Sequence, residues 1–328
     1  MGCLVRRVLV LTHTGREEAV DAARQVVRLL VDHGLEPVLL DDEAADIPDC
    51  TGVRRVQPGA VEDLELVVVL GGDGTVLRAA ELVHGTDVPL LGVNLGHVGF
   101  LAETERDALE STVAHVAARE YSVEERLTLQ VDVVEGGVVR ATSWALNDVS
   151  VEKGARERVL ELVTEVDGRP VSSYGCDGVV MATPTGSTAY AFSAGGPVVW
   201  PGVQALLMVP ISAHALFARP LVVSPDSVMA VEVLERNQTD GVVWCDGRRA
   251  VPVHPGARIE VRRGAAPVRL AHISTGPFTD RLVAKFGLAV GWWRGPEDGE
   301  GRGHPAPAHP APPATGTGAT PSTGPAGG

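Results

Sequence analysis

Short apolar runs alternate with amphipathic stretches over the first third of the chain. The apolar runs predict strands at residues 6–15, 35–40, 64–70 and 89–101. Helical spacing separates them, first at Val20, Ala23, Val27, Leu30 and Val31 and again over residues 75–85. This alternation predicts a parallel sheet that is covered on both faces. Ligands of such sheets bind at the carboxyl ends of the strands, where two glycine-bearing stretches fall, 71–75 and 92–99.

A different pattern begins near residue 120. Short β-branched runs separated by Gly, Asp and Pro predict many strands, at residues 126–151, 158–171, 178–184, 227–235, 241–253 and 258–264. Few helical periods lie among them, so an antiparallel sandwich or layered sheet is expected. A helix is predicted again at 277–288. From residue 295 onward a Pro- and Gly-rich composition without apolar periodicity predicts a disordered tail.

Composition narrows the class of protein. A chain of 328 residues with 45% hydrophobic side chains can bury a full core, and its length favours two domains. The formal net charge of -14 argues against nonspecific binding to nucleic acid or to an anionic membrane, since both require a surplus of Lys and Arg. Small molecules are therefore the expected ligands.

The cysteines and the N-terminus indicate a cytoplasmic protein. Cys3, Cys50, Cys176 and Cys245 show no C-x-x-C pairing, so reduced thiols are expected rather than a zinc site or a disulfide. The apolar stretch at the start is too short and too soon interrupted for a signal peptide, and no segment reaches membrane-spanning length.

The stretch Gly71-Gly72-Asp73-Gly74-Thr75 lies where a predicted strand ends and a helix begins. It is neither a P-loop, because the lysine is missing, nor the G-x-G-x-x-G dinucleotide motif. Asp73 has a purely structural interpretation as a turn or N-cap residue. Its functional interpretation is that the carboxylate takes a proton from an attacking hydroxyl or positions a magnesium ion, and both point to phosphoryl transfer.

A second stretch is dense in hydroxyl groups. Between residues 177 and 197 they belong to Thr183, Thr185, Ser187, Thr188, Tyr190 and Ser193. A surface turn needs no such density, whereas a polar pocket for a sugar or a base does. The sequence therefore predicts a nucleotide-binding pocket here.

Five motifs in this order resemble the bacterial NAD kinases, which make NADP with ATP or polyphosphate. They are GGDGT (71–75), GVNLGHVGFL (92–101), NDVSV (147–151), CDGVVMATPTGSTAYAFSAGGPVVWP (176–201) and CDGRR (245–249). GGDGT alone is shared with lipid kinases and, in related form, with phosphofructokinases, whereas the long fourth motif is far more specific. The resemblance covers roughly residues 5 to 294.

The resemblance implies four parts of the chain. These are a Rossmann-like α/β domain (1–120), a β-rich, sandwich-like NAD-binding domain (121–276), a C-terminal helix that returns to the first domain (277–294) and the tail (295–328). The site would lie between the two domains. The implied ligands are NAD, ATP or polyphosphate, and Mg²⁺ or another divalent cation with ATP. A homo-oligomer, a dimer or a tetramer, is also implied.

The resemblance assigns roles to the residues of this chain that match the family's motifs. Asp73 would accept the proton of the adenosine ribose 2′-hydroxyl, the donor phosphates would face Gly71, Gly72, Gly74 and Thr75, and NAD would also contact Gly74. Further NAD contacts would come from Arg78, Asn147, Asp148, Arg158, Asp177, Thr188, Ala189, Tyr190, Ala191, Phe192, Ser193 and Arg248. No protein metal ligands are implied.

Two positions depart from the family pattern. Gly175 stands where many relatives carry a basic residue, so a phosphate contact is lost there. Arg248 stands where many carry Gln, and it either contacts a phosphate or is simply solvated. His97 and His214 are expected to satisfy backbone groups.

Two other functions compete with this one. A lipid kinase would need a membrane-docking surface, against which the acidic balance argues. A regulator that kept the fold and lost the chemistry could dispense with Asp73, which is present.

Overall fold

The structure is a computed structural model that describes residues 5–47, 50–59, 61, 63–96, 99–102, 104–105, 108–155, 158–273 and 276–289. The tail predicted at 295–328 and the expectation for His97 lie outside these residues. In the described part of the chain, no helix has the length and apolar character needed to cross a membrane.

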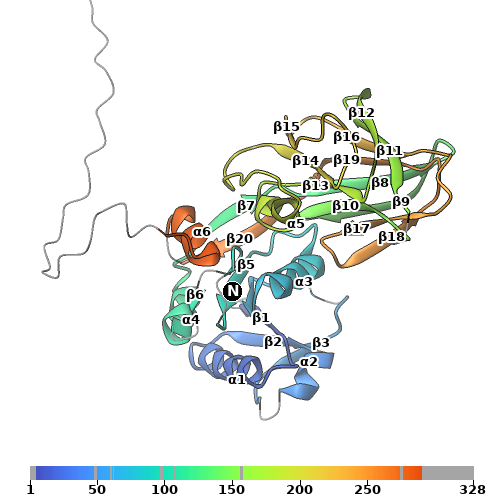
Figure 1. Cartoon of the computed structure of the whole chain (residues 1–328). Coiled ribbons are helices and arrows are strands. Elements are labelled where there is room, and N and C mark those ends of the chain that lie inside the picture. Colours follow the sequence, from blue (N-terminus) through green and yellow to red (C-terminus); the bar gives the residue numbers. More distant parts are fainter. Residues whose placement is uncertain are drawn as a thin grey trace, which may run out of the picture. The chain divides into compact units, whose positions relative to one another are not determined.

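The first domain is built on one eight-stranded sheet (Figure 1). Its strands are β1 (Arg7–Thr12), β2 (Glu36–Leu40), β3 (Arg54–Val56), β4 (Leu66–Leu70), β5 (Leu90–Asn94), β6 (Thr104–Glu105), β7 (Ser122–Arg126) and β20 (Val268–His272). Their order is β3-β2-β1-β4-β5-β20-β7, with β6 beside β5. All neighbours run parallel except β20 and β7. The predicted α/β architecture is confirmed.

Helices cover both faces of this sheet, because its central strands are apolar on both sides. The helices are α1 (Glu17–Asp32), α2 (Asp41–Asp46), α3 (Asp73–Val83) and α4 (Leu109–Ala118). α1 and α4 share one buried cluster with β1 and β4, and α3 belongs to a second cluster with the alternate residues of the same strands. Val31 was expected on the buried side of α1, but it is 42% exposed because Val27 and Leu30 already face the sheet. α4 is not among the elements predicted from the pattern.

Two strands of the first sheet come from the range 121–276, which the sequence pattern assigned wholly to the β-rich domain. β7 follows α4 directly, and β20 pairs with β5 across a long stretch of chain. Leu270 and Ala271 of β20 lie in the buried clusters of the first domain. The sequence pattern did not predict β20 and included only the last residue of β7, and a local pattern cannot say which sheet a strand joins.

The second domain consists of two six-stranded antiparallel sheets. The first contains β15 (Leu221–Val223), β14 (Leu206–Ile211), β13 (Gly178–Ala182), β10 (Asp148–Lys153), β17 (Gly241–Cys245) and β18 (Arg249–Val253), in this order. The second contains β12 (Arg169–Cys176), β11 (Leu160–Val166), β16 (Met229–Val233), β19 (Arg258–Arg263), β8 (Leu129–Glu135) and β9 (Val138–Ala145). One apolar core draws residues from both sheets, so the predicted sandwich is confirmed.

Three short helical elements lie around this sandwich and the first domain. The 3₁₀ turn η2 (Thr185–Thr188) and α5 (Tyr190–Ser193) follow β13, and α6 (Phe278–Phe286) follows β20. The ring of Phe286 lies 5.7 Å from that of Phe100 in the first domain and 4.5 Å from that of Phe192 in the second. α6 therefore contacts both domains.

Candidate active site

The glycine loop connects the buried end of β4 to the N-terminus of α3. Gly71 has a φ of +155°, and a Cβ there would lie 2.5 Å from Oγ1 of Thr75, so the position requires glycine. No atom lies within 4 Å of where a Cβ would stand on Gly72 or Gly74. The main chain is thus uncovered at a helix N-terminus, where N–H groups and the helix dipole favour an anion.

This loop forms one wall of a hollow of about 700 Å³. The hollow is also bordered by the end of β1, the start of α1 and the end of β5; its lining residues include Thr12, Gly15, Arg16, Glu18, Gly71, Gly72, Gly74, Thr75, Arg78, Asn94, Gly96 and Arg248. We call it the glycine-loop hollow. Arg16 and Arg78 border it from the first domain and Arg248 from the second, which suits a phosphorylated ligand. Arg248 is not simply solvated, because its Nε and Nη2 donate to Glu81 at 3.0 and 3.1 Å.

Arg78 is held at this hollow by the first domain. Its Nη1 lies 2.5 Å from Oε1 of Glu43 and 3.4 Å from the carbonyl oxygen of Thr12. Burial raises the pKa of Glu43, while the N–H of Thr12 and the charge of Arg78 act in the opposite direction. Arg78 thus borders the glycine-loop hollow with its guanidinium held in place, while its contact with NAD stays a prediction.

Asp73 begins α3, but its carboxylate is directed to the chain that follows β5. Oδ1 accepts hydrogen bonds from the N–H groups of Phe100 and Leu101, each at 3.0 Å, and Oδ2 accepts a longer one from Phe100 at 3.3 Å. A Cβ on Gly99 would lie 2.5 Å from Oδ1, so Gly99 lets the two segments meet. Asp73 therefore joins the glycine loop to this segment, a role that neither the turn nor the N-cap interpretation includes.

A second hollow, of about 510 Å³, contains the Asn147–Asp148 pair. Its lining residues are Leu77, Asn147, Asp148, Ser150, Glu152, Ala189, Tyr190, Trp244, Asp246 and Gly247. We call it the Asn–Asp hollow. It shares two walls with the glycine-loop hollow: α3 contributes Leu77 here and Thr75 there, and the β17–β18 turn contributes Gly247 here and Arg248 there.

The carboxyl group of Asp148 has an unusual titration. Burial and the nearby charge of Asp246 raise its pKa to about 7, and a smaller effect of Glu152 acts in the same direction. The N–H of Tyr190 opposes the shift. Burial also raises the pKa of Asp246. At neutral pH Asp148 can therefore both donate and accept a hydrogen bond.

The hydroxyl-rich stretch supports the main chain more than it lines a pocket. Oγ1 of Thr183 donates to the carbonyl of Leu146 at 2.6 Å, and Oγ of Ser187 donates to that of Pro184 at 2.7 Å. A Cβ on Gly186 would lie 1.9 Å from the carbonyl oxygen of Asn147, so this stretch rests directly on the pair. Of the six hydroxyl residues, Tyr190 lines the Asn–Asp hollow, and the predicted nucleotide pocket stays a prediction.

The strip from Thr188 to Ser193 is only partly at a hollow. Ala189 and Tyr190 line the Asn–Asp hollow. Ala191 is fully buried under β13 and β14, and Phe192 faces α6. Oγ1 of Thr188 donates to the carbonyl of Thr185 at 3.3 Å.

Asp73, Asp177 and Arg158 are not among the described residues that line the two hollows. Asp177 forms an ion pair with Lys153, which lowers the pKa of the carboxyl group, and it is half-exposed. Arg158 is exposed at the start of β11. The main-chain N–H of His214 donates to the carbonyl of Gly175 at 2.9 Å; this bond does not involve the imidazole, so the expectation for the His214 side chain stays a prediction.

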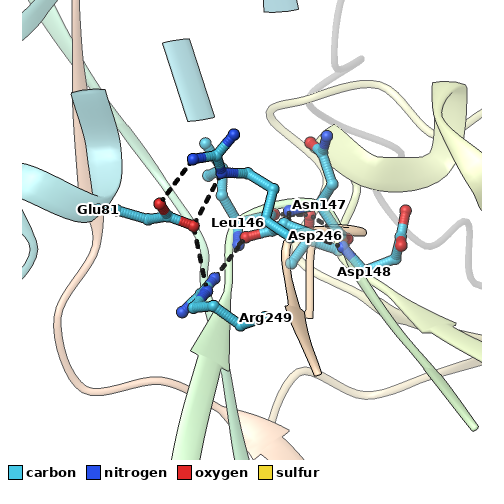
Figure 2. Close-up of polar contacts among 8 residues, drawn as sticks. Glu81, Leu146, Asn147, Asp148, Asp246 and Arg249 are labelled. Carbon is cyan, nitrogen blue, oxygen red and sulfur yellow. Dashed lines mark hydrogen bonds and ion pairs between the residues drawn. The ribbon is translucent and has the colours of Figure 1, made fainter. Parts of the chain in front are cut away.

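Sequence reasoning did not single out Asp246. Its carboxylate accepts hydrogen bonds from the N–H groups of Leu146, Asn147 and Asp148, at 2.9, 2.7 and 3.3 Å (Figure 2). The available signal was an Asp-Gly pair directly after a strand, which is typical of a tight turn. Both residues indeed have a positive φ, +53° and +63°.

A protein metal site usually needs several His, Cys, Asp or Glu side chains close together. Among the described residues, no group of three His, Cys, Asp or Glu side chains is placed to hold a metal ion. The residues present therefore do not form a protein cage for a divalent cation.

The fold and the two adjoining hollows define a two-domain α/β and β-sandwich enzyme with an anion-binding glycine loop. A model of the ATP-NAD kinase N-terminal domain matches residues 8–121, and one of the ATP-NAD kinase C-terminal domain matches residues 146–273. An NAD kinase from Leifsonia xyli subsp. xyli is 60% identical over 300 residues, covering 89% of this chain and 98% of that protein. NAD kinase 2 of Streptomyces coelicolor is 58% identical over 294 residues, covering 89% and 97%.

Two solved structures share the fold. Yeast NADH kinase complexed with NADH has a TM-score of 0.79 at 23% identity and covers 87% of this chain and 89% of its own. An NAD kinase from Archaeoglobus fulgidus in complex with ATP has a TM-score of 0.65 at 25% identity, with 86% and 97% covered. The chain belongs to the NAD kinase family, and its activity is that of an NAD kinase.

Proposed function

We propose that the enzyme transfers the terminal phosphoryl group of ATP to the 2′-hydroxyl of the adenosine ribose of NAD, giving NADP. The observation that carries this proposal is that one helix, α3, borders both hollows within a single turn, at Thr75 and Leu77. A donor in one hollow and an acceptor in the other would meet across that turn. Such proximity is a major part of phosphoryl-transfer catalysis.

The donor belongs in the glycine-loop hollow. Gly71, Gly72, Gly74 and Thr75 present an uncovered main chain at the N-terminus of α3, and Arg78 and Arg248 supply positive charge. ATP is preferred as the donor because the Archaeoglobus relative was solved in complex with it. Polyphosphate presents the same terminal group, so the donor assay includes both.

NAD belongs in the Asn–Asp hollow. Asn147 and Asp148 would hydrogen-bond its adenosine part, with Ala189 and Tyr190 beside them. Phe192 contacts α6, which would support the end of the same strip. We retain Gly74, Arg78, Arg158, Asp177, Thr188, Ser193 and Arg248 as proposed contacts of NAD, of which Gly74, Arg78 and Arg248 border the glycine-loop hollow. We do not retain Ala191, because it is fully buried.

Asp73 is the proposed proton acceptor for the 2′-hydroxyl. Its Oδ1 is occupied by the N–H groups of Phe100 and Leu101, whereas Oδ2 accepts only the longer contact from Phe100. A carboxylate oxygen offers about two lone-pair directions, so Oδ2 keeps capacity for a hydroxyl proton. The same two N–H groups hold the carboxylate in one orientation, as a general base requires.

We propose that a divalent cation binds together with ATP and not at a site of its own on the protein. Mg²⁺ usually binds through substrate phosphates and water with one or two protein carboxylates, and this is the mode that we propose. No step of the proposal is carried by the metal.

The cellular setting is part of the proposal. Cys176 and Cys245 are buried free thiols, as in proteins of a reducing cytoplasm. We also propose a homo-oligomer, a dimer or a tetramer, because the neighbouring Leu216 and Phe217 are exposed at 112% and 57%. Light scattering on the purified protein measures the assembly size directly.

The test of function is a coupled assay. Purified protein is incubated with NAD, MgCl₂ and either ATP or polyphosphate, and NADP is detected with an NADP-specific dehydrogenase. ATP is expected to support NADP formation that depends on time and on enzyme concentration. Absence of NADP with both donors would refute the proposal, and NADP with polyphosphate alone would reassign the donor.

A further inference from the structure

Asp246 fixes the main chain of the Asn147–Asp148 pair. It lies in the turn between β17 and β18, and its side chain is only 2% exposed. Its carboxylate receives three consecutive main-chain N–H groups, from residues 146 to 148, as Figure 2 shows. Charge-assisted bonds of this kind are among the stronger hydrogen bonds in proteins. The direction in which the pair faces the Asn–Asp hollow therefore depends on Asp246.

Arg249 connects Asp246 to the first domain. Its Nη2 lies 3.0 Å from Oδ2 of Asp246, and its Nε lies 3.2 Å from Oε1 of Glu81 (Figure 2). Glu81 is on α3, two turns beyond the glycine loop. We call these three residues the Glu81–Arg249–Asp246 bridge. It links the helix of the donor loop to the residues that face the acceptor.

Glu81 and Arg249 are half-buried, and neither of them lines either hollow. The side chains of Glu81 and Arg249 are 24% and 27% exposed. Of the three residues only Asp246 borders the Asn–Asp hollow, among the described lining residues. Glu81 and Arg249 can thus influence catalysis only through other groups.

We propose that the Glu81–Arg249–Asp246 bridge is a positioning device that sets the Asn147–Asp148 pair against the glycine loop, so that the acceptor hydroxyl meets the donor phosphate. This inference rests on the proposed function, because it takes NAD to bind at that pair. An acceptor displaced by about 1 Å can lower the rate by roughly a hundredfold. The bridge joins the two domains directly beside the hollows, where such a displacement would arise.

The test is a double-mutant cycle with Glu81→Gln, Arg249→Gln and the double variant. Each single change should lower kcat/KM for NAD by about tenfold. Arg249→Gln leaves the carboxylate of Asp246 without its arginine, and Glu81→Gln removes the carboxylate that pairs with both Arg249 and Arg248. If the two residues act through one bridge, the double variant should lose no more than about the larger single effect. KM for ATP should stay within about threefold in Arg249→Gln, because Arg249 does not border the glycine-loop hollow.

Glu65→Gln provides the matched control. Glu65 also bridges two arginines, with Arg6 Nη2 at 2.5 Å and Arg119 Nη2 at 2.9 Å, but within the first domain. Its loss should lower the melting temperature and leave kcat/KM for NAD within twofold. Arg249→Lys keeps the charge but lacks the guanidinium group that contacts Glu81 and Asp246 at the same time, so it should recover only part of the lost activity. It replaces Arg249→Gln in the cycle if Arg249→Gln does not fold.

Three results would overturn the inference. They are single variants with unchanged kcat/KM for NAD, a double variant whose loss equals the product of the single losses, and a Glu65→Gln effect of the same size. The wild-type assay separates this failure from a failure of the proposed function: an enzyme that makes NADP normally while the variants behave as wild type refutes the bridge alone.

Discussion

The imidazole of His84 stacks on the indole of Trp144, with ring centroids 3.7 Å apart and planes 3° from parallel. His84 follows α3 in the first domain, and Trp144 is on β9 in the second. The guanidinium of Arg249 lies over the same indole at 4.6 Å. The stack and the Glu81–Arg249–Asp246 bridge thus join the domains at neighbouring points.

Trp144→Leu should lower the melting temperature by about 3 to 8 °C. A stacked pair contributes roughly 0.5 to 1.5 kcal/mol beyond area burial, the lost indole adds to this, and a protein of this size loses about 2 to 4 °C per kcal/mol. Thermal melts of Trp144→Leu, His84→Ala and the double variant measure the effect. Independent, additive losses would show that the two rings do not stabilise each other.

The stack should also make stability depend on pH. Burial, and to a lesser degree Arg249, lower the pKa of His84 below its usual value in the folded protein. His84 therefore binds a proton more readily in the unfolded chain than in the folded protein. The contribution of neutral His84 to the free energy of unfolding is fully present above about pH 6.5, and it is lost as the pH falls through 6.5 toward the folded pKa. The melting temperature of wild type minus that of His84→Gln should shrink between pH 7.5 and 5.5. A constant difference would contradict the shift.

Asp148→Asn should show the opposite dependence. The folded-state pKa of Asp148 is raised to about 7 by burial and by Asp246, with Glu152 adding to it and the N–H of Tyr190 opposing it. The contribution of Asp148 to the free energy of unfolding is fully present below about pH 4 and is lost as the pH rises through about 7. The amide cannot ionise, so at pH 8 the variant should melt several degrees higher than wild type, and this difference should shrink steadily as the pH falls from about 7 toward 4. Equal melting temperatures at pH 8 would contradict the burial of a charged carboxylate.

Gly99→Ala should reduce activity without unfolding the protein. The added Cβ would lie 2.5 Å from Oδ1 of Asp73 and must push the carboxylate or the adjoining main chain aside. We expect kcat to fall by about tenfold or more, since a misplaced base loses proton-transfer efficiency. Gly202→Ala is the control, because no atom lies within 4 Å of its Cβ position. Unchanged turnover in Gly99→Ala would mean that the carboxylate is not needed where the structure places it.

Local patterns predicted the elements well but not their long-range partners. The apolar run at 64–70 and the glycines after it led directly to β4, the loop and α3, because strand, turn and helix are encoded by neighbouring residues. The pairing of β20 with β5 was missed, since nothing near Leu270 identifies its partner. Arg78 and the Asn147–Asp148 pair were assigned to NAD through the family resemblance, and this assignment stays a prediction.

The remaining differences concern what side chains do once folded. The hydroxyls of Thr183 and Ser187 donate hydrogen bonds to nearby main-chain carbonyl groups, which composition alone cannot reveal. Asp246 was overlooked because an Asp-Gly turn is common, and its three N–H partners come from about a hundred residues earlier in the chain.

The kinetics of Asp73→Asn test the proposed mechanism most directly. Asn keeps an oxygen acceptor for the N–H groups of Phe100 and Leu101, so the segment after β5 should stay in place and the melting curve should change little. The amide is not a base, and kcat should therefore fall by about 10² to 10⁴, with KM for NAD changed by less than about threefold. Turnover within threefold of wild type, in a variant that melts normally, would contradict the assignment of Asp73 as the proton acceptor.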